Sequence, residues 1–412
     1  MKILFIHQNF PGQFKHLAPA LVKQGHSIRS LSLGGLAIPN IESCKYSVSH
    51  SSSKSIHPFA IDFETKMIRG EGCATAMLEM KQAGYTPDLI IAHPGWGEAI
   101  FARDIFPTTK QLHFLEFFYD AIGRDVGFDP EFSNTYSETK TFNVRIKNAA
   151  ALISLLQMDY GYAPTHWQKQ SWPIDYHNRI DVIFDGIDTN QVAPLKNPLE
   201  VITIKTVDGQ LIHIGSEDEV ITFVNRNLEP YRGYHSFMRA LPEILRLRPN
   251  ARALIIGGDG VSYGAKAPTG NTWKNIFLDE VRDQLDLSRV HFLGNTSYSN
   301  YLNILKLSSC HIYFTYPFVL SWSCLEAMSA ACVVVGSKTP PVEEVITHGV
   351  NGLLVDFFDK DGLVNQVVSV LSEPLKYAPI GAAARKHIVD NYDLETICLP
   401  KQIALVEKIL SS

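Results

Sequence analysis

The stretch that decides the fold runs from residue 312 to 355 and reads IYFTYPFVLSWSCLEAMSAACVVVGSKTPPVEEVITHGVNGLLV. An apolar strand pattern at 312–316 leads through a loop into a helical pattern that begins near Trp322. A second apolar run follows at 332–337. Continuous Val, Ile and Leu runs predict strands that are covered on both faces, and the order strand, helix, strand predicts a parallel sheet with a crossover helix.

The same alternation fills the rest of the chain. Amphipathic helical patterns separate the predicted strands. The strand-like runs are 2–7, 27–33, 88–93, 112–118, 151–156 and 181–184 in the first half, and 220–226, 252–258, 290–294, 311–316, 332–337 and 352–358 in the second. The predicted fold class is therefore α/β, with two doubly wound, Rossmann-like parallel-sheet domains.

The predicted break between the domains lies in a proline-rich segment, VAPLKNP, that precedes a β-hairpin at about 202–218 with Asp208-Gly209 at its turn. We expect an N-terminal domain at 1–195, a second domain at 196–390, and a C-terminal helical segment at 391–412 that packs back on the first domain. Ligands bind at the carboxyl ends of parallel strands, so two such domains predict a cleft between those ends.

Composition narrows the class of function. The 412 residues carry a net charge of −5, which argues against a general nucleic-acid binder. The six cysteines are scattered, without the spacing of a zinc site, and indicate a reduced, cytoplasmic protein. The first apolar run stops at Ile6, too early for a signal peptide. The sequence contains no run of about 18 apolar residues, so no membrane-spanning helix is predicted. Peripheral contact with the inner face of a membrane stays open, as does the oligomeric state.

The strongest candidate site is the start of the helix at 322. A helix N-terminus presents backbone N–H groups and a positive dipole, which suit a phosphate, and Ser321, Trp322 and Ser323 surround it. Glu326 lies one turn further, where a carboxylate can hold the two hydroxyls of a ribose. The alternative is that Ser321 only caps the helix and Glu326 is a surface residue.

A second candidate follows the strand at 220–226. Arg226 and Arg232 flank NLEPY, and two guanidinium groups can clamp a diphosphate, although a pair of solvated surface arginines is the alternative. Gly258, in LIIGGDG, permits a tight turn near a ligand, but neither GxGxxG nor a Walker pattern is present.

The first domain offers polar and aromatic residues after three strands. Gly12, in HQNFPGQF, lets the backbone approach a phosphate or sugar, or else starts a helix after Pro11. His93 can hydrogen-bond a sugar, with capping of the next turn as the alternative. Glu116 stands among aromatic residues, where a carboxylate needs a partner. We assign six residues to the acceptor side: His7, Asn9, Phe10, Trp96, Glu116 and Arg145, the last with a solvated helix face as its alternative.

Two negative observations bear on mechanism. The run Asp359-Lys360-Asp361 is the chain's DxD-type motif, but it precedes a helix and is interpreted as an N-cap, so no metal site is predicted. No nucleophile elbow or Ser-His-Asp signature appears.

In this order the segments resemble glycosyltransferase family 4, the retaining group 1 enzymes of the GT-B fold. MKILFIHQNFPGQF resembles the opening strand and loop, DVIFDGIDTNQVAP the end of the first domain, and NRNLEPYRG the basic motif of the second domain. LEAMSAACVVVGSKTPPVEEVITHGVNGLLV is the closest match. The resemblance covers nearly the whole chain apart from the hairpin.

The resemblance implies roles for individual residues. Arg226 and Arg232 would hold the donor diphosphate and act in catalysis with His93, and Glu326 would hold the ribose. The remaining donor-binding residues would be Gly12, Gly258, Ser321, Trp322 and Ser323, together with Phe292, Leu293, Gly294 and Asn295 beside the base. Two positions depart from the family: Phe318 replaces a glutamate that contacts the donor sugar, and Ala331 replaces a glycine.

The expected function is metal-independent transfer, with retention, of a sugar from a nucleotide sugar to an acceptor hydroxyl, without a cofactor. The expected carrier is UDP, and the acceptor is a glycan, a lipid-linked sugar or a small metabolite, as in polysaccharide biosynthesis. The alternatives are a nucleotide-sugar epimerase or phosphorylase on the same fold, and an impaired protein that binds nucleotide sugars.

Overall fold

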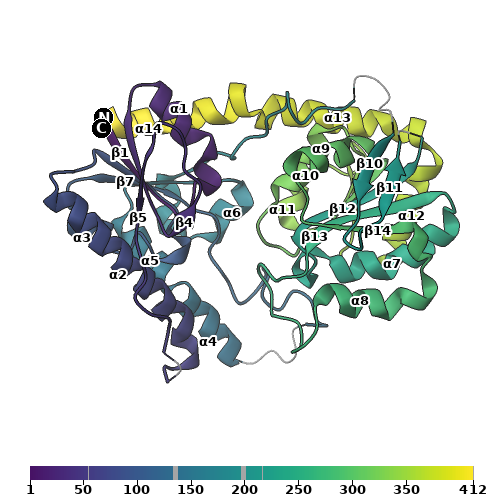
Figure 1. The fold of residues 1–412 in the computed structure, drawn as a ribbon, viewed down its shortest axis with the longest axis horizontal. Helices are drawn as coiled ribbons and strands as arrows, with labels where there is room; N and C mark the ends of the chain where they lie inside the picture. Colours follow the sequence, from purple (N-terminus) through teal and green to yellow (C-terminus); the bar gives the residue numbers. More distant parts are fainter. Residues whose placement is uncertain (54, 133–137, 196–200, 216, 412) are drawn as a thin grey trace. The chain divides into compact units, whose positions relative to one another are not determined.

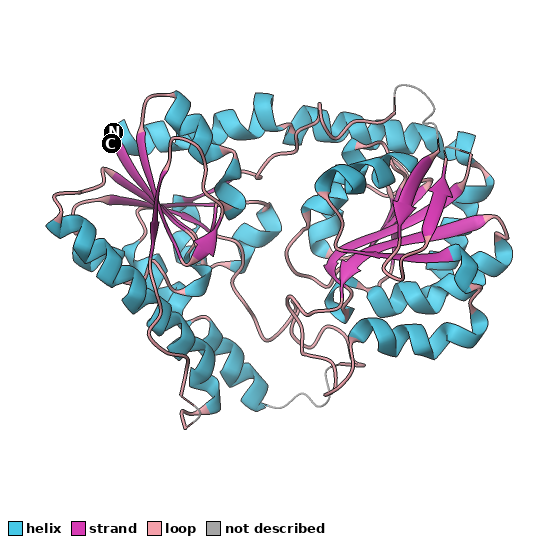
Figure 2. Cartoon of the chain, in the orientation of Figure 1, coloured by secondary structure: helices cyan, strands magenta, loops and turns pink. Residues whose placement is uncertain are grey.

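The computed structural model describes residues 1–53, 55–132, 138–195, 201–215 and 217–411. The chain divides into two compact units (Figures 1 and 2). Unit 1 comprises Met1–Gly186 and Glu395–Ser412, and unit 2 comprises Ile187–Leu394. Each unit is an α/β structure around one main parallel sheet, which confirms the predicted fold class.

The sheet of unit 1 has seven parallel strands in the order β5-β3-β1-β6-β7-β8-β9. The strands are β1 (Lys2–Ile6), β3 (Ser27–Ser32), β5 (Glu42–Lys45), β6 (Leu89–Ala92), β7 (Lys110–Phe114), β8 (Tyr160–Ala163) and β9 (Ile180–Val182), with a short parallel pair β2 (Asn9–Phe10) and β4 (Gly34–Gly35) beside them. The helices are α1 (Leu17–Lys23), α2 (Ile61–Gln82), α3 (Ala102–Ile105), α4 (Glu138–Lys147), α5 (Ala149–Gln157), α6 (His166–Ser171) and α14 (Leu399–Ser411).

Alternate side chains of β1 enter opposite cores. Ile3 and Phe5 pack with apolar residues of α1 and α14, whereas Leu4 and Ile6 pack with α2 and α3. This alternation explains why the strand is apolar at every position from Ile3 to Ile6, because both faces of the sheet are covered.

One predicted strand is wrong. Residues 151–156 lie in helix α5, and the strand at this place in the sheet is β8, with the sequence YGYA. A short apolar run does not distinguish a strand from a helix by periodicity. Alanines at 149–151 favour the helix, and it buries only one side, since Leu155 is buried and Leu156 is exposed.

The sheet of unit 2 has six parallel strands in the order β14-β13-β12-β15-β16-β17. The strands are β12 (Glu219–Asn227), β13 (Ala251–Gly258), β14 (Val290–Gly294), β15 (Cys310–Tyr313), β16 (Val334–Ser337) and β17 (Leu353–Val355). The helices are α7 (Tyr234–Leu247), α8 (Trp273–Val281), α9 (Tyr298–Leu307), α10 (Trp322–Ser329), α11 (Pro340–Glu343), α12 (Lys360–Ser372) and α13 (Pro374–Tyr392). The predicted hairpin is present as the antiparallel pair β10 (Ile202–Lys205) and β11 (Leu211–Ile214), with Gly209 at a φ of 89° in its turn.

The two points where the chain enters and leaves unit 2 are hydrogen-bonded to each other. Ile187 N donates to Tyr392 O at 2.9 Å, and Leu394 N donates to Ile187 O at 2.8 Å. Arg385 donates to the carbonyls of Thr189 and Val192 at 2.8 and 2.7 Å. These contacts place 187–195 in unit 2, so unit 1 ends at Gly186 and not near residue 195.

The C-terminal segment returns to unit 1. A π-helical turn at Leu394–Cys398 separates α13 from α14. Three residues of α14 belong to the core of unit 1: Leu405, Val406 and Ile409. No helix in the described part of the chain is long and apolar enough to cross a membrane.

Helix α10 ends at a strained residue. Ala331 has a φ of 62°, and the N–H groups of Ala331 and Cys332 donate to Met328 O and Ala327 O, both at 3.0 Å. This pattern requires a left-handed residue just after the helix, a position that glycine occupies without strain. It is the position where the family resemblance implies glycine.

We predict that Ala331→Gly raises the free energy of unfolding of unit 2 by about 1 kcal/mol, because a left-handed alanine costs about 1–2 kcal/mol. Its neighbour Ala330, with a φ of −74°, is the matched control. Ala330→Gly should instead lower the free energy by about 0.5–1 kcal/mol. Urea denaturation of the two variants measures this, and a loss of stability in both would contradict the assignment of strain.

Candidate functional site

The carboxyl ends of the strands in unit 2 lie at one edge of its sheet, because all six strands are parallel. β12, β13 and β14 end at Asn227, Gly258 and Gly294. Apart from Gly12, the donor-side residues predicted from the sequence lie in the last residues of these strands, in the loops that follow them, or in α10 and the loop before it. Ligands bind at this edge in open parallel sheets.

Ser321 caps helix α10, as the structural alternative predicts. Its Oγ accepts a hydrogen bond from Ser323 N at 3.4 Å and lies 3.0 Å from Ser323 Oγ. Its own N–H donates to Tyr313 Oη at 2.8 Å. Trp322 is half-buried as the first residue of the helix. The cap fixes the helix N-terminus at the carboxyl edge but does not exclude an anion there.

Glu326 is not a surface residue. It is 6% exposed, and its two carboxylate oxygens accept hydrogen bonds from Tyr298 Oη and Tyr301 Oη, both at 2.7 Å. Burial raises the pKa of Tyr301 well above its ordinary value, and the charge of Glu326 raises it further. The tyrosines therefore remain donors that orient the carboxylate, and each of its oxygens keeps a lone pair for a further hydroxyl. The sequence interpretation missed both tyrosines, although their spacing of three residues on one helix face was visible.

The two predicted arginines differ in environment. Arg226 is exposed near the end of β12, and it makes no hydrogen bond or ion pair within the described ranges. Arg232 is 5% exposed, and its Nη1 donates to Thr315 Oγ1 and to Val319 O, both at 2.9 Å. The alternative of two solvated arginines thus fits Arg226 but not Arg232.

Phe318 packs against Arg232 instead of providing a carboxylate. Its side chain is 2% exposed, its ring lies 4.9 Å from that of Tyr263, and the Arg232 guanidinium lies 5.9 Å from its ring centre. The same guanidinium lies 5.0 Å from the ring of Tyr263. Two adjacent aromatic rings thus cover one side of the cation, at the point where the family has an acidic side chain.

The segment predicted to flank the base runs from Phe292 to Asn295. The Lys274 ammonium lies 4.9 Å from the Phe292 ring centre, and Phe292 O accepts from the hairpin residue Val207 at 2.9 Å. Leu293 is buried, whereas Gly294 is half-buried and Asn295 is exposed. At Gly258 an added Cβ would lie 2.8 Å from Asn227 Oδ1, so a larger residue at this turn would displace the Asn227 side chain.

In unit 1, Gly12 is required by His7. Gly12 has a φ of 49°, and a Cβ there would lie 2.2 Å from His7 Nε2. His7 Nδ1 accepts from Asn9 N at 3.0 Å, and Nε2 lies 2.8 Å from Gln13 Oε1. Since Nδ1 accepts, Nε2 carries the hydrogen of the neutral ring.

His93 both caps a turn and faces a carboxylate. Its Nδ1 accepts from Gly95 N at 3.1 Å, as the capping alternative predicts, and its ring stacks on Trp96 with centroids 4.1 Å apart. Its Nε2 has no hydrogen-bond partner among the residues that the structure describes, and it lies 3.8 Å from Glu116 Oε2. Gln13 Nε2 donates to Glu116 Oε1 at 3.4 Å. Glu116 thus lies near His93 directly and is linked to His7 through Gln13, a residue that the sequence interpretation missed.

The other residues assigned to the acceptor side are not part of this group. The Phe10 side chain is 2% exposed in the core of unit 1, so it cannot contact an acceptor. Asn9 is exposed, and Arg145 is exposed on α4. Lys147, which follows Arg145 on α4, lies 3.5 Å from the ring centre of Tyr119 and does not pair with Glu116.

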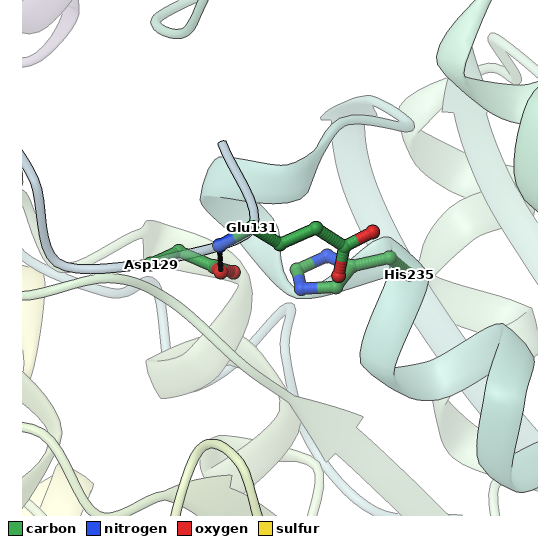
Figure 3. Close-up of side chains that lie close together, drawn as sticks. All are labelled: Asp129, Glu131 and His235. Carbon is green, nitrogen blue, oxygen red and sulfur yellow. Dashed lines mark hydrogen bonds between the residues drawn. The ribbon is translucent and has the colours of Figure 1, made fainter. Parts of the chain in front are cut away.

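Three polar residues outside these groups make local structural contacts. Asp359 Oδ1 accepts from Gly362 N at 2.8 Å, which confirms the predicted N-cap. In unit 1, Asp129 Oδ1 accepts from Glu131 N at 3.0 Å within a loop (Figure 3). In unit 2, His235, also drawn in Figure 3, projects from α7 and packs against Phe277 with ring centroids 5.5 Å apart.

Family models match both parts of the chain. The model described as Glycosyl transferase family 4 group matches residues 23–192, and the model Glycosyl transferases group 1 matches residues 211–387. Together they leave few residues unmatched outside the termini and the linker.

Curated relatives match only in part. A GDP-mannose-dependent monoacylated alpha-(1-6)-phosphatidylinositol monomannoside mannosyltransferase from Corynebacterium glutamicum is 25% identical over 230 residues, which are 53% of this chain and 54% of that protein. A glycogen synthase from Mycobacterium tuberculosis is 25% identical over 218 residues, 53% of this chain and 46% of that protein. The chain thus spans about half the length of the curated relatives it matches.

Solved structures match over the whole length. HepE from Anabaena, in complex with UDP and glucose, has a TM-score of 0.66 at 18% identity and covers 99% of both chains. The sucrose-phosphate synthase from Thermosynechococcus elongatus has a TM-score of 0.71 at 14% identity and covers 100% of both. At these identities the comparison establishes the fold.

We predict a pH-dependent loss of stability from the buried histidines. Burial lowers the pKa of His93 well below 6.5, with a further contribution from His7, and burial lowers that of His113 to about 4. As the pH falls, these histidines therefore take up protons in the unfolded chain before they do so in the folded chain. The contribution of the neutral histidines to the free energy of unfolding is complete above pH 6.5. It is lost below pH 6.5, by at most about 1.4 kcal/mol per pH unit for each histidine.

His93→Asn should reduce this slope between pH 6 and pH 5, whatever its effect on stability at neutral pH. Urea denaturation at several pH values measures the slope. An unchanged slope in the variant would show that His93 is not held neutral.

Proposed function

Because the chain belongs to the group 1 glycosyltransferases, we propose that it transfers a sugar from a nucleoside-diphosphate sugar to an acceptor hydroxyl. The observation that carries the proposal is the buried Glu326 carboxylate, which two tyrosines orient one turn inside a helix whose N-terminus lies at the carboxyl edge of the sheet. A carboxylate suits a ribose diol and a helix N-terminus suits a diphosphate. HepE, a protein of the same fold, binds UDP.

The proposed donor site lies in unit 2. Ser321, Trp322 and Ser323 would surround the diphosphate, with Arg226 and Arg232 supplying positive charge. The base would lie beside the segment from Phe292 to Asn295. Tyr298, three residues further along the chain, donates to Glu326, the carboxylate proposed to bind the ribose, so this segment lies close to the proposed ribose position. Arg226 is exposed and without a partner in the described ranges, so it is available to a ligand, whereas Arg232 is fixed by its two bonds to the loop after β15.

The proposed chemistry is retention at the anomeric carbon. The bond between that carbon and the diphosphate oxygen breaks towards an oxocarbenium-like state, and the acceptor oxygen bonds on the same face. The departing phosphate oxygen takes the acceptor's proton. The arginines and the helix N-terminus would stabilise the charge that grows on the phosphate, and the loss of one such donor typically costs about a hundredfold in rate.

The same arginines are the basis for proposing metal independence. They would supply the positive charge that the leaving diphosphate needs, and the chain's DxD-type run is used as a helix cap. UDP is the proposed carrier, with a UDP sugar as co-substrate and no further cofactor.

Unit 1 is the proposed acceptor side. His93, Trp96, Glu116 and Gln13 combine hydrogen-bonding groups with an aromatic face, which suits a sugar-like or other hydroxyl-bearing acceptor. Neutral His93 would orient an acceptor hydroxyl, because its Nε2–H is a donor. We propose a glycan, a lipid-linked sugar or a small metabolite as acceptor, with a role in polysaccharide biosynthesis as the broad context. None of the described cysteines is in a disulfide, which supports a cytoplasmic location, and we propose the inner membrane face as a place of peripheral contact.

A second candidate function has one observation in its favour. Phe318 is buried against Arg232, so position 318 offers no polar contact to a donor sugar. A protein that binds nucleotide sugars without transferring them fits this observation. Turnover with any acceptor would exclude it. Use of phosphate as co-substrate would favour a phosphorylase, and release of an altered sugar without an acceptor would favour an epimerase.

We predict that a panel of nucleotide sugars in the absence of metal contains one donor that raises the melting temperature. At a concentration of a hundredfold its Kd, a ligand adds about 2.7 kcal/mol of stability. Arg226→Ala should abolish the rise. Arg282→Ala, which removes a surface arginine paired with Asp279, should keep it. A rise that survives in both variants would remove Arg226 from the site, and no rise with any donor would contradict the proposed function.

We further predict that the product has the same anomeric configuration as the donor and forms in the presence of EDTA. Proton NMR of the anomeric signal during turnover measures the configuration. An inverted product would rule out the proposed stereochemistry, and a reaction that stops on chelation would rule out metal independence.

A further inference from the structure

Glu229 is a buried carboxylate with an unusual set of partners. It is 1% exposed, and it accepts backbone hydrogen bonds from Ser262 at 3.0 Å and from Tyr263 and Gly264 at 3.3 Å. Three consecutive N–H groups around one carboxylate compensate the cost of burying its charge. The loop after β13 is thus fastened to the loop after β12.

Asn227 fastens the same loop at its beginning. Asn227 Nδ2 donates to Ser262 Oγ at 2.7 Å, and Gly260 N donates to Asn227 Oδ1 at 3.2 Å. An added Cβ on Gly264 would lie 3.0 Å from the Tyr231 ring, so the loop is closely packed at its other end. These contacts fix the backbone of residues 260–264 at the carboxyl edge of the sheet.

The fixed loop places the Tyr263 ring centre 5.0 Å from the Arg232 guanidinium, with the Phe318 ring beside it at 4.9 Å from that of Tyr263. Tyr263 is half-buried, so part of it faces outward, whereas Phe318 is 2% exposed. In a nucleotide sugar the sugar is bonded directly to the terminal phosphate. If Arg232 contributes to the diphosphate site, Tyr263, the partly exposed ring beside its guanidinium, is therefore well placed to contact the sugar.

We propose that Tyr263 contacts the donor sugar and that Glu229 is the positioning residue that holds it there. This inference rests on the proposed donor site. The chain then recognises its sugar through an aromatic face, and not through a carboxylate at position 318. The substrate class is a sugar that presents C–H groups on one face of its ring, because aromatic side chains bind such faces by apolar contact.

The proposal has a consequence for specificity. A site built to hydrogen-bond a hydroxyl rejects an analogue that lacks it by about four to five orders of magnitude, whereas an apolar surface discriminates only by about 10–200-fold. Nucleotide sugars that differ by one missing hydroxyl on the face towards Tyr263 should accordingly differ little in affinity.

The test compares each nucleotide with its own sugar, using UDP and UDP-glucose as one pair and GDP and GDP-mannose as another. Isothermal titration gives the Kd of each probe for the wild-type chain, Tyr263→Leu and Glu229→Ala. For the pair that binds, both variants should weaken the nucleotide sugar about tenfold, as expected for the loss of one stacking contact, and leave the nucleotide within about twofold. Tyr263→Phe, which keeps the ring, should bind the nucleotide sugar like the wild type.

Tyr298→Phe is the matched control. It removes a hydrogen bond to Glu326, which is proposed to bind the ribose, so it should weaken the nucleotide and the nucleotide sugar by the same factor. Equal weakening of both members by Tyr263→Leu, or no change in either, would overturn the role of Tyr263. If only Glu229→Ala fails to fold, Tyr263→Leu still decides. A wild-type chain that binds neither pair would instead overturn the donor site, an outcome distinct from a failure of Tyr263 alone.

Discussion

The buried charges of Glu229 and Arg232 tie three loops of unit 2 together, and the arrangement of the carboxyl edge depends on them. Glu229 holds the loop after β13 through three backbone N–H groups. Arg232 holds the loop after β15 through Thr315 and Val319. A buried charge without partners would cost several kcal/mol, so each charge requires the loop that it binds to stay in place. The two residues lie three positions apart, so a single short segment after β12 organises its neighbours on both sides.

This organisation gives a physical context to the departure at position 318. An acidic side chain there would lie beside Arg232, where Phe318 now packs with Tyr263 and covers the guanidinium. The aromatic residues keep water from Arg232 without neutralising it. A cation in such surroundings interacts strongly with an incoming phosphate, because little solvent screens it. In the proposed donor site, the absence of the glutamate would thus change how the sugar is recognised, while the conditions for anion binding would be retained.

The strands were predictable wherever they read as continuous aliphatic runs. All six strands of the main sheet in unit 2 coincide with predicted apolar runs, because helices cover both faces of the sheet and each strand buries a mainly apolar stretch. The failures lie where this rule does not apply. β8 reads YGYA and β5 reads ESCK, so neither carries an aliphatic run, and residues 151–156 are an apolar helix. The family resemblance indicated Glu326 and Arg232, but their partners Tyr298, Tyr301 and Tyr263 come from other loops and helices. Such partners depend on tertiary packing, which one sequence does not reveal.

The most direct test of the central claim, a donor site at the carboxyl edge of unit 2, is a crystal structure of the chain with a bound nucleoside diphosphate. The account predicts a diphosphate at the N-terminus of α10 near Ser321, a ribose whose hydroxyls bond to Glu326, and a base beside Gly294 and Asn295. A nucleotide bound elsewhere on the chain, or a ribose without contact to Glu326, would contradict it.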